Sequence, residues 1–261
     1  MTKRLISIAA AVVALLCATP DVMAGDQPVQ LAQMAERLSR DRLGDIEPGT
    51  YLAGDNLKFS IDRGDGYFLF RMDGSPEIFV LHSEAASLGG RVLKYDSGET
   101  ALRVAGWGGI TLYTDSSPSG LPVVRTGEST PPRRTNVSPA EIQKAAKDEA
   151  QRINTIRGLH MSFDADWKKL NANADLRALA LDALENASRG IERFTANAVG
   201  RQEVSRRIGA VLMTTGLRPS VSMRGRTLLA TFNPANGFEG RASSRAFAKA
   251  MDEMFANQRL H

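Results

Sequence analysis

Two arginines flank a glycine near the C-terminal end of the chain, in Arg224-Gly225-Arg226. Residues 221–223 and 227–232 on either side read as the two strands of a hairpin, which places both arginines at its turn. The planar guanidinium fork pairs well with phosphate and carboxylate groups. The pattern suggests an anion-binding tip, but an ordinary solvated turn is the favoured interpretation.

Trp107 stands among Gly106, Gly108 and Gly109 at a turn between two expected strands. Glycine tolerates the positive φ that such a reversal needs. The large aromatic side chain can be an exposed platform for a ligand or a packed cap on the turn. Packing is favoured because buried tryptophan is common. Trp107 nevertheless joins Arg224 and Arg226 as our candidate binding residues.

Asp164 and Asp166 precede Trp167 and flank a single alanine. Two carboxylates beside an aromatic ring suit the acid and base of a glycosidase. They also suit the cap and first turn of a helix, where the helix dipole stabilises negative charge. The helix cap is the favoured interpretation.

The three histidines of the chain, His82, His160 and His261, are far apart in sequence. None has a second histidine or a carboxylate at a zinc-ligand spacing. The sequence also lacks a nucleophile elbow, a phosphate-binding loop and a dinucleotide-binding fingerprint. We expect no metal and no cofactor, and the catalytic residues of any enzyme remain unknown.

Residues 1–24 have the three parts of a secretory signal peptide. A basic head, 1–4, precedes an apolar run, 5–16, and small residues lead up to Ala24. The only cysteine, Cys17, lies inside this segment, so the mature chain would be free of cysteine. No later apolar run is long enough for a transmembrane anchor. We expect a periplasmic or secreted protein.

Residues 25–115 predict a helix, 27–43, followed by an antiparallel β-sheet. Six short segments between 57 and 115 alternate apolar and polar residues and are separated by glycine turns, which is typical of a sandwich or a barrel-like sheet. Residues 116–137 are rich in proline, serine and threonine, so we interpret them as a linker between two domains.

Residues 138–261 predict a second domain that is mainly helical. It opens with a capping box at Ser138 and Glu141. We expect helices near 139–157, 175–198, 204–215 and at the C-terminal end, a short strand near 159–163, and a β-hairpin across 221–232. The fold class is therefore α+β, with an antiparallel β-rich N-terminal half and a mainly helical C-terminal half with a hairpin.

Charge is distributed unevenly between the two halves. The segment from 25 to 126 carries 14 acidic and 10 basic side chains, whereas the segment from 138 to 261 carries 13 acidic and 19 basic ones. A basic half can meet an acidic polymer or an anionic surface. A solvated helical surface is the favoured alternative.

Three segments, 106–115, 232–235 and 237–241, resemble an uncharacterised family of exported proteins from alphaproteobacteria, a domain of unknown function. The resemblance spans most of the mature chain. It implies a periplasmic location, and it supplies no activity and no functional residues.

These observations favour an exported cell-envelope protein that is a non-enzymatic binding or accessory module. Its expected partner is an envelope protein or an anionic cell-wall component, and no nucleic acid is expected. The alternatives are a purely structural accessory protein and an envelope hydrolase with carboxylate-based catalysis, whose acidic residues would converge only in the fold.

Overall fold

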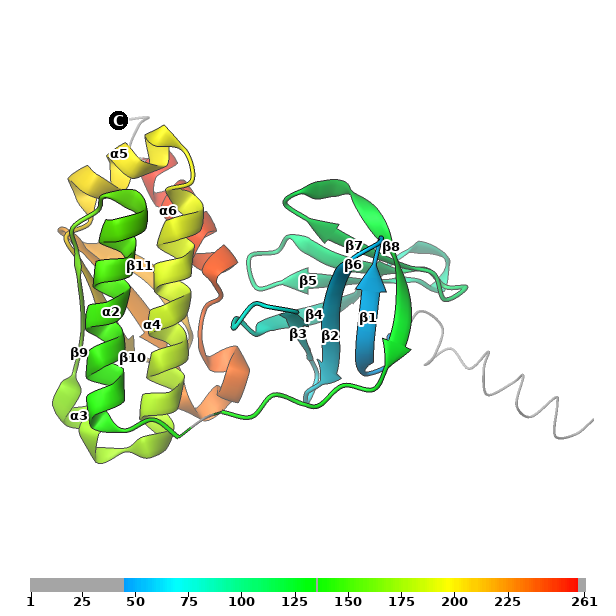
Figure 1. Ribbon diagram of the computed structural model, residues 1–261, viewed down its shortest axis with the longest axis horizontal. Coiled ribbons are helices and arrows are strands. Elements are labelled where there is room, and N and C mark those ends of the chain that lie inside the picture. The colour runs from blue at the N-terminus through cyan, green and yellow to red at the C-terminus, as the bar shows by residue number, and fades with distance from the viewer. Residues whose placement is uncertain (1–44, 135, 258–261) are drawn as a thin grey trace, which may run out of the picture. The chain divides into compact units, whose positions relative to one another are not determined.

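The computed structural model describes residues 45–134 and 136–257. The predicted signal peptide, 1–24, and the predicted helix, 27–43, lie outside these residues and stay predictions. An antiparallel barrel forms the N-terminal half of the described chain, and helices with a second sheet form the C-terminal half (Figure 1). In the described ranges, no helix has the length and apolar character needed to cross a bilayer.

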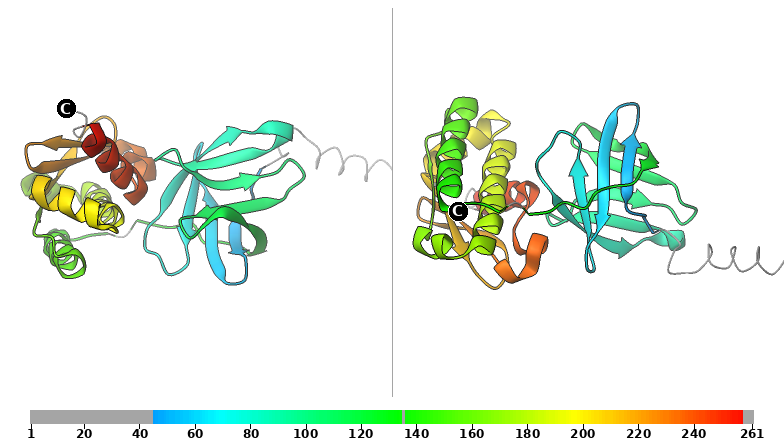
Figure 2. Two further views of the ribbon diagram at one scale, coloured as in Figure 1. Left: turned by 90° about the horizontal axis from the view of Figure 1, so that it is seen from above. Right: turned by 60° about the horizontal axis from the view of Figure 1, so that its bottom comes forward.

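Eight antiparallel strands make the barrel, each hydrogen-bonded to the next and the last to the first (Figure 1, Figure 2). They are β1 (Gly49–Ala53), β2 (Leu57–Arg63), β3 (Phe68–Met72), β4 (Phe79–Ala85), β5 (Arg91–Tyr95), β6 (Thr100–Val104), β7 (Ile110–Thr114) and β8 (Ser117–Gly127). The short helix η1 (Ser87–Gly89) lies between β4 and β5. The predicted antiparallel β-rich half is thus confirmed.

Aromatic side chains fill the interior of the barrel. The rings of Tyr51, Phe59, Phe70, Phe79 and Tyr95 follow one another at centroid separations of 5.1 to 6.2 Å. All five residues are buried. Side chains on alternate positions of each strand point inward, and in a barrel of this size they pack into a solid core.

Strand β8 occupies the first half of the segment that the sequence predicts to be a linker. It pairs with β1 on one side and with β7 on the other, and thereby closes the barrel. The prediction of a linker over 116–137 is wrong for this strand. Two prolines, Pro118 and Pro122, hide the strand in the sequence, since proline cannot donate to a ladder. Pro122 still takes part through its carbonyl, which accepts the Gly54 amide at 3.0 Å.

The C-terminal sheet has four strands in the order β11-β12-β10-β9. Strand β10 runs parallel to both β9 and β12, and β11 runs antiparallel to β12. The strands are β9 (Ser162–Ala165), β10 (Ala210–Thr215), β11 (Ser220–Arg224) and β12 (Thr227–Phe232). The expected hairpin is therefore one edge of a larger, mostly parallel sheet.

Helices α2, α4 and α6 pack side by side on one face of this sheet (Figure 1). The helical elements of this half are α2 (Pro139–Arg157), α3 (Trp167–Ala172), α4 (Ala174–Phe194), α5 (Ala198–Arg207), η2 (Pro234–Gly240) and α6 (Ser244–Asn257). Helix α2 begins and ends as predicted. Ser138 and Glu141 form a capping box, and Gly158 ends α2 with φ of 67°.

The helix predicted near 204–215 is wrong in its second part, because α5 ends at Arg207 and β10 begins at Ala210. Val204, Ile208 and Val211 have helical spacing, which produced the prediction. Ile208 instead has extended backbone angles, and the Gly209 amide donates to the carbonyl of Arg226 at 2.8 Å. Pairing with a neighbouring strand overrides the local pattern.

Glycine lets α4 and α6 approach closely. A Cβ atom added to Gly190 of α4 would lie 2.3 Å from the Cβ of Phe247 in α6. Phe247 is 1% exposed, and the backbone carbonyl of Ser244 is also close to Gly190. The helix pair therefore depends on the absence of a side chain at this position.

The barrel caps the first turn of α6 with two carboxylates. Glu77 accepts hydrogen bonds from the Ser244 amide at 2.8 Å and from its hydroxyl at 2.7 Å. Asp96 accepts hydrogen bonds from the amide and the hydroxyl of Ser243. Negative charge is favourable at a helix N-terminus, where the backbone amides are otherwise unpaired. Glu77 is only 3% exposed, so this contact belongs to the protein interior.

Arg245 extends the same junction. Its guanidinium contacts Asp115 at 2.6 Å and Glu99 at 2.8 Å, and it lies 4.5 Å from the ring centroid of Tyr95. Burial alone would raise the pKa of Asp115, but the hydrogen bonds and charges of Arg245 and Arg193 outweigh burial and lower this pKa. The charged form of Asp115 is thus stabilised at the junction between the two halves.

Candidate functional site

Three parallel strands end at one edge of the C-terminal sheet, at Ala165 in β9, Thr215 in β10 and Phe232 in β12. Ligands of open parallel sheets bind at this carboxyl edge, where the residues after the strands converge. A pocket of about 390 Å³ lies there. It is lined by Ala165, Asp166, Lys169, Leu170, Leu176, Leu212, Met213, Thr214, Thr215 and Phe232. We call it the edge pocket.

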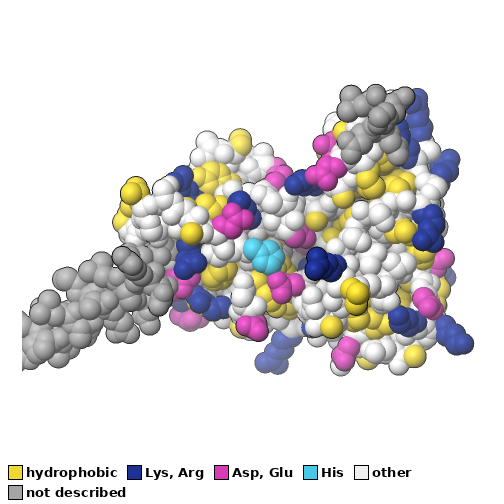
Figure 3. Space-filling model, turned by 180° about the vertical axis from the view of Figure 1, so that it is seen from behind, with side chains coloured by type: hydrophobic (Ala, Val, Ile, Leu, Met, Phe, Trp, Pro, Cys, Tyr) yellow, Lys and Arg dark blue, Asp and Glu magenta, His cyan; other side chains and the backbone are white. Residues whose placement is uncertain are grey.

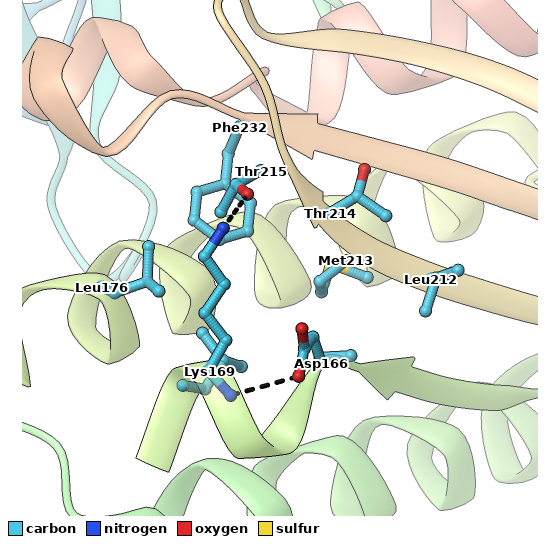
Figure 4. A pocket seen from close by; sticks show the side chains of 10 residues that line it. Asp166, Lys169, Leu176, Leu212, Met213, Thr214, Thr215 and Phe232 are labelled. Atoms are coloured by element: carbon cyan, nitrogen blue, oxygen red, sulfur yellow. Dashed lines mark hydrogen bonds between the residues drawn. The ribbon is translucent and has the colours of Figure 1, made fainter. Parts of the chain in front are cut away.

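Lys169 supplies the positive charge of the edge pocket (Figure 4). Its Nζ donates a hydrogen bond to Oγ1 of Thr215 at 2.7 Å. Among residues 45–134 and 136–257, no carboxylate lies within the 4.0 Å of this ammonium that an ion pair requires. An ammonium has three N–H groups, so two remain for water or for an acceptor on a ligand.

Asp166 fixes the position of Lys169. It follows β9 directly and is the N-cap of α3, with Oδ1 accepting the Lys169 backbone amide at 3.1 Å (Figure 4). Leu170, the next residue, is 3% exposed and anchors the helix in the core. The helix-cap interpretation of Asp166 is therefore confirmed. Asp164 is exposed, and its Oδ1 accepts the amide of Ala165 at 2.8 Å.

Apolar side chains form the remaining wall of the edge pocket. Leu176 stands in the first turn of α4, where its amide donates to the side chain of Asn173 at 3.0 Å. Met213 and Phe232 point from β10 and β12 toward the buried face of the sheet and are nearly inaccessible to solvent. The combination of one ammonium, one carboxylate, hydroxyl groups and an apolar wall suits a small amphipathic molecule with an anionic group.

Trp107 lies at the tip of the hairpin between β6 and β7 and is 81% exposed. The expectation that it packs the turn is therefore wrong. Backbone geometry holds this turn without help from the indole: Gly108 has φ of 94°, and its amide donates to the carbonyl of Ala105 at 2.9 Å. A second backbone bond, from Ala105 to Gly109 at 2.7 Å, closes the hairpin.

Replacing Trp107 by alanine is expected to change the free energy of unfolding by less than about 0.5 kcal/mol, as for other exposed positions. Urea unfolding followed by circular dichroism measures this change. The matched comparison is Phe70→Ala inside the barrel, for which we expect a loss of about 3–5 kcal/mol. A loss above about 2 kcal/mol in Trp107→Ala would show that the indole is packed after all.

Arg224 and Arg226 flank the turn of the β11–β12 hairpin, where Gly225 has φ of 59°. Arg226 donates from Nη2 to the carbonyl of Ser205 at 3.3 Å. This turn precedes β12, so it lies at the sheet edge opposite to the edge pocket. Trp107 belongs to the barrel. The structure does not bring the three candidate binding residues together, and their roles stay predictions.

Basic side chains are dispersed over the face shown in Figure 3, where Lys and Arg alternate with Asp and Glu. The excess of basic residues in the C-terminal half does not form a continuous patch on that face. His82 lies near one acidic residue, with 3.8 Å between its Nε2 and Oε1 of Glu239. In the described part of the chain, no group of three or more His, Cys, Asp or Glu side chains is arranged to hold a metal ion.

The sequence alone does not identify Lys169 as a site residue. One sequence feature points to it: a short apolar segment, expected to be a strand, is followed by Asp166, a residue typical of a helix N-cap. A helix that begins there has Lys169 in its first turn, directly after the strand. Recognising the site also requires the parallel pairing of β9 with β10, and the sequence pattern of β10 predicts a helix. Without that strand there is no carboxyl edge at which a pocket would be expected.

Comparison with known proteins identifies one family. A family model described as "Domain of unknown function (DUF4908)" matches residues 30–251. No curated protein and no solved structure matches the chain.

Proposed function

We propose that this chain, which belongs to the DUF4908 family of unknown function, is an exported cell-envelope protein that binds a small amphipathic anion in its edge pocket. The observation that carries the proposal is the ammonium of Lys169, which faces the pocket with a hydroxyl partner and without a carboxylate partner among the described residues. A carboxylate or phosphate on a ligand would complete its hydrogen bonding.

The size and lining of the edge pocket support a small ligand. About 390 Å³ is within the usual range for small-molecule sites, which are mostly apolar with a few placed polar groups. Thr215 orients the ammonium from one side. Leu212, which is partly exposed, and Leu176 line the pocket with apolar side chains on the side of the uncharged part of the ligand. The expected ligand therefore has an anionic head and a short apolar body.

The alternative proposal, an envelope hydrolase with two catalytic carboxylates, has less support. Such chemistry needs a pair of carboxyl groups roughly 5–10 Å apart on either side of the bond that breaks. Asp166 is the single carboxylate in the lining of the edge pocket, and one of its oxygens already caps α3. Binding is accordingly the function that we propose.

Two probes with the same hexyl chain, heptanoate and hexyl phosphate, test the proposal on the chain from Gly25 onward. We expect both to shift amide and methyl resonances of the edge pocket and to raise the melting temperature, because a ligand that binds the folded state stabilises it. Hexanol, which lacks the charge, should bind more weakly.

Lys169→Met should weaken the binding of both anions by about tenfold or more, because it removes a charge-assisted hydrogen bond. Lys168→Met is the matched control: it removes the same charge from the neighbouring exposed position and should leave the affinity unchanged. Equal affinities in the two variants, or no binding of either anion at millimolar concentration, would refute the proposed site.

A further inference from the structure

Two loops lie together beside one hollow of the barrel surface. One loop contains η1 between β4 and β5, and the other is the turn between β6 and β7. Their backbones touch: a Cβ atom added to Gly106 would lie only 2.2 Å from the carbonyl oxygen of Leu88. Leu88 and Trp107 both line a hollow of about 360 Å³ between the loops. We call the two loops together the paired tips.

Each of the paired tips presents one large apolar side chain to water. Leu88 is 85% exposed and Trp107 is 81% exposed. Leu88 is also the only non-glycine residue with positive φ in the described ranges, at 58°. This conformation is unfavourable for a residue with a Cβ. Neither the backbone conformation nor the exposure of Leu88 stabilises the barrel, which points to a role of this side chain in binding.

The loops are held in shape by their own backbone hydrogen bonds. In the first loop, the Ala86 amide donates to Gly90 at 2.9 Å and the Gly90 amide donates to Ser87 at 3.2 Å. The second loop is closed by the bonds around Trp107 described above. The apolar side chains therefore project from a preformed support and do not need to be ordered on binding.

The strand ends that flank the paired tips carry positive charge. Residues 86–91 and 103–109 contain Arg91 and Arg103 and no acidic residue. Arg103 is exposed and lines the hollow with Trp107. The nearest acidic residue along the first loop, Glu84, pairs with Lys94 at 2.6 Å. A negatively charged surface would therefore meet the exposed Arg103 and the partly exposed Arg91 beside these loops, and no carboxylate within them.

We propose that the paired tips are a membrane-surface anchor that inserts Leu88 and Trp107 into the interfacial region of a bilayer containing anionic phospholipids. Tryptophan is enriched at the level of the lipid headgroups, because its ring is apolar and its N–H is polar. Arginines beside an apolar side chain attract anionic lipids, and the hydrophobic contact adds to this attraction.

A bilayer fits these tips better than a partner protein does. A stable protein interface buries roughly 800 Å² on each side around a packed centre. Two side chains that project from narrow loops offer less than that, and they suit a soft surface into which they can be inserted. The proposal concerns the barrel and is independent of the edge pocket.

Tryptophan fluorescence tests this anchor directly, because Trp107 and Trp167 are the only tryptophans of the chain. Trp167→Phe leaves Trp107 as the single reporter. The chain from Gly25 onward is used, since the apolar run 5–16 would itself bind lipid. On vesicles of phosphatidylglycerol and phosphatidylethanolamine, we expect a blue shift of the emission and quenching by brominated acyl chains.

Sedimentation with the same vesicles measures the partition coefficient of variants. Leu88→Ser and Trp107→Ala should each lower it roughly tenfold, because each removes a large apolar side chain from the interface. Arg103→Gln should lower it roughly fivefold, and added salt should weaken binding of the unaltered chain. Leu217→Ser is the control, since Leu217 is 91% exposed in the C-terminal half and should have no effect.

Three results would overturn the proposal. The first is an unshifted emission in the presence of vesicles. The second is vesicle binding that Leu88→Ser and Trp107→Ala leave unchanged, which would place the contact on another surface. The third is emission of Trp107 that is already blue-shifted without lipid, which would show that another part of the chain or a second copy covers the paired tips.

Discussion

Replacing Glu77 by alanine is expected to lower the free energy of unfolding by about 3 kcal/mol. The carboxylate is buried and accepts two hydrogen bonds from Ser244, at the first turn of α6. Its removal leaves the amide and the hydroxyl of Ser244 without these partners in a site that is closed to solvent. It also removes a negative charge from the positive end of the helix dipole.

Urea unfolding of Glu77→Ala, Ser244→Ala and the double variant measures how much of this loss belongs to the contact itself. We expect the double variant to be less unstable than the sum of the single ones, because the second substitution removes a group that the first leaves unpaired. Glu84→Ala, which breaks an exposed pair with Lys94, should cost less than about 1 kcal/mol. A similarly small loss in Glu77→Ala would contradict the buried cap.

Gly190→Ala is expected to destabilise the protein by about 2 kcal/mol, although alanine is the better helix former. In an exposed helix the same substitution would stabilise by about 1 kcal/mol. Here the new Cβ would lie 2.3 Å from the Cβ of Phe247, so α4 and α6 must separate. The sign of the effect therefore distinguishes packing from helix propensity.

Gly209→Ala is the matched control for this experiment. Its backbone does not have positive φ, and an added Cβ would have its nearest contact, Nε of Arg226, at 3.6 Å, an ordinary separation. We expect a neutral effect or a small gain from the reduced freedom of the unfolded chain. Thermal unfolding of both variants gives the comparison, and equal melting temperatures would show that the α4–α6 contact can relax at no cost.

Local sequence patterns predict those strands, turns and helix ends that are determined by their own side chains and not by distant parts of the chain. The glycine turns and period-two segments identify six barrel strands, and Ser138 with Glu141 identifies the start of α2. Strand β8 could not be predicted in this way, because it contains two prolines and its pairing with β1 joins residues about 75 positions apart, such as Tyr51 and Arg125. The local alternation of apolar and polar residues does not show which distant strand a segment pairs with.

The candidate site depends on long-range pairing even more strongly. Lys169 is chemically ordinary in the sequence, and its place at a pocket follows from the parallel alignment of β9 with β10. The glycine neighbours of Trp107 indicate a special turn, but whether its indole packs or projects depends on which loop lies beside it. Leu88, its neighbour in the paired tips, gives no signal in the sequence, since an exposed leucine in a loop has no distinctive pattern.

The cap on α6 has a consequence for the order in which the chain can fold. Glu77 and Ser244 are separated by 167 positions in the sequence. During synthesis from the N-terminus, the barrel emerges long before the helix that it caps, and domains that emerge first generally fold first. We therefore expect α6 to dock last, onto a barrel that already presents Glu77 and Asp96.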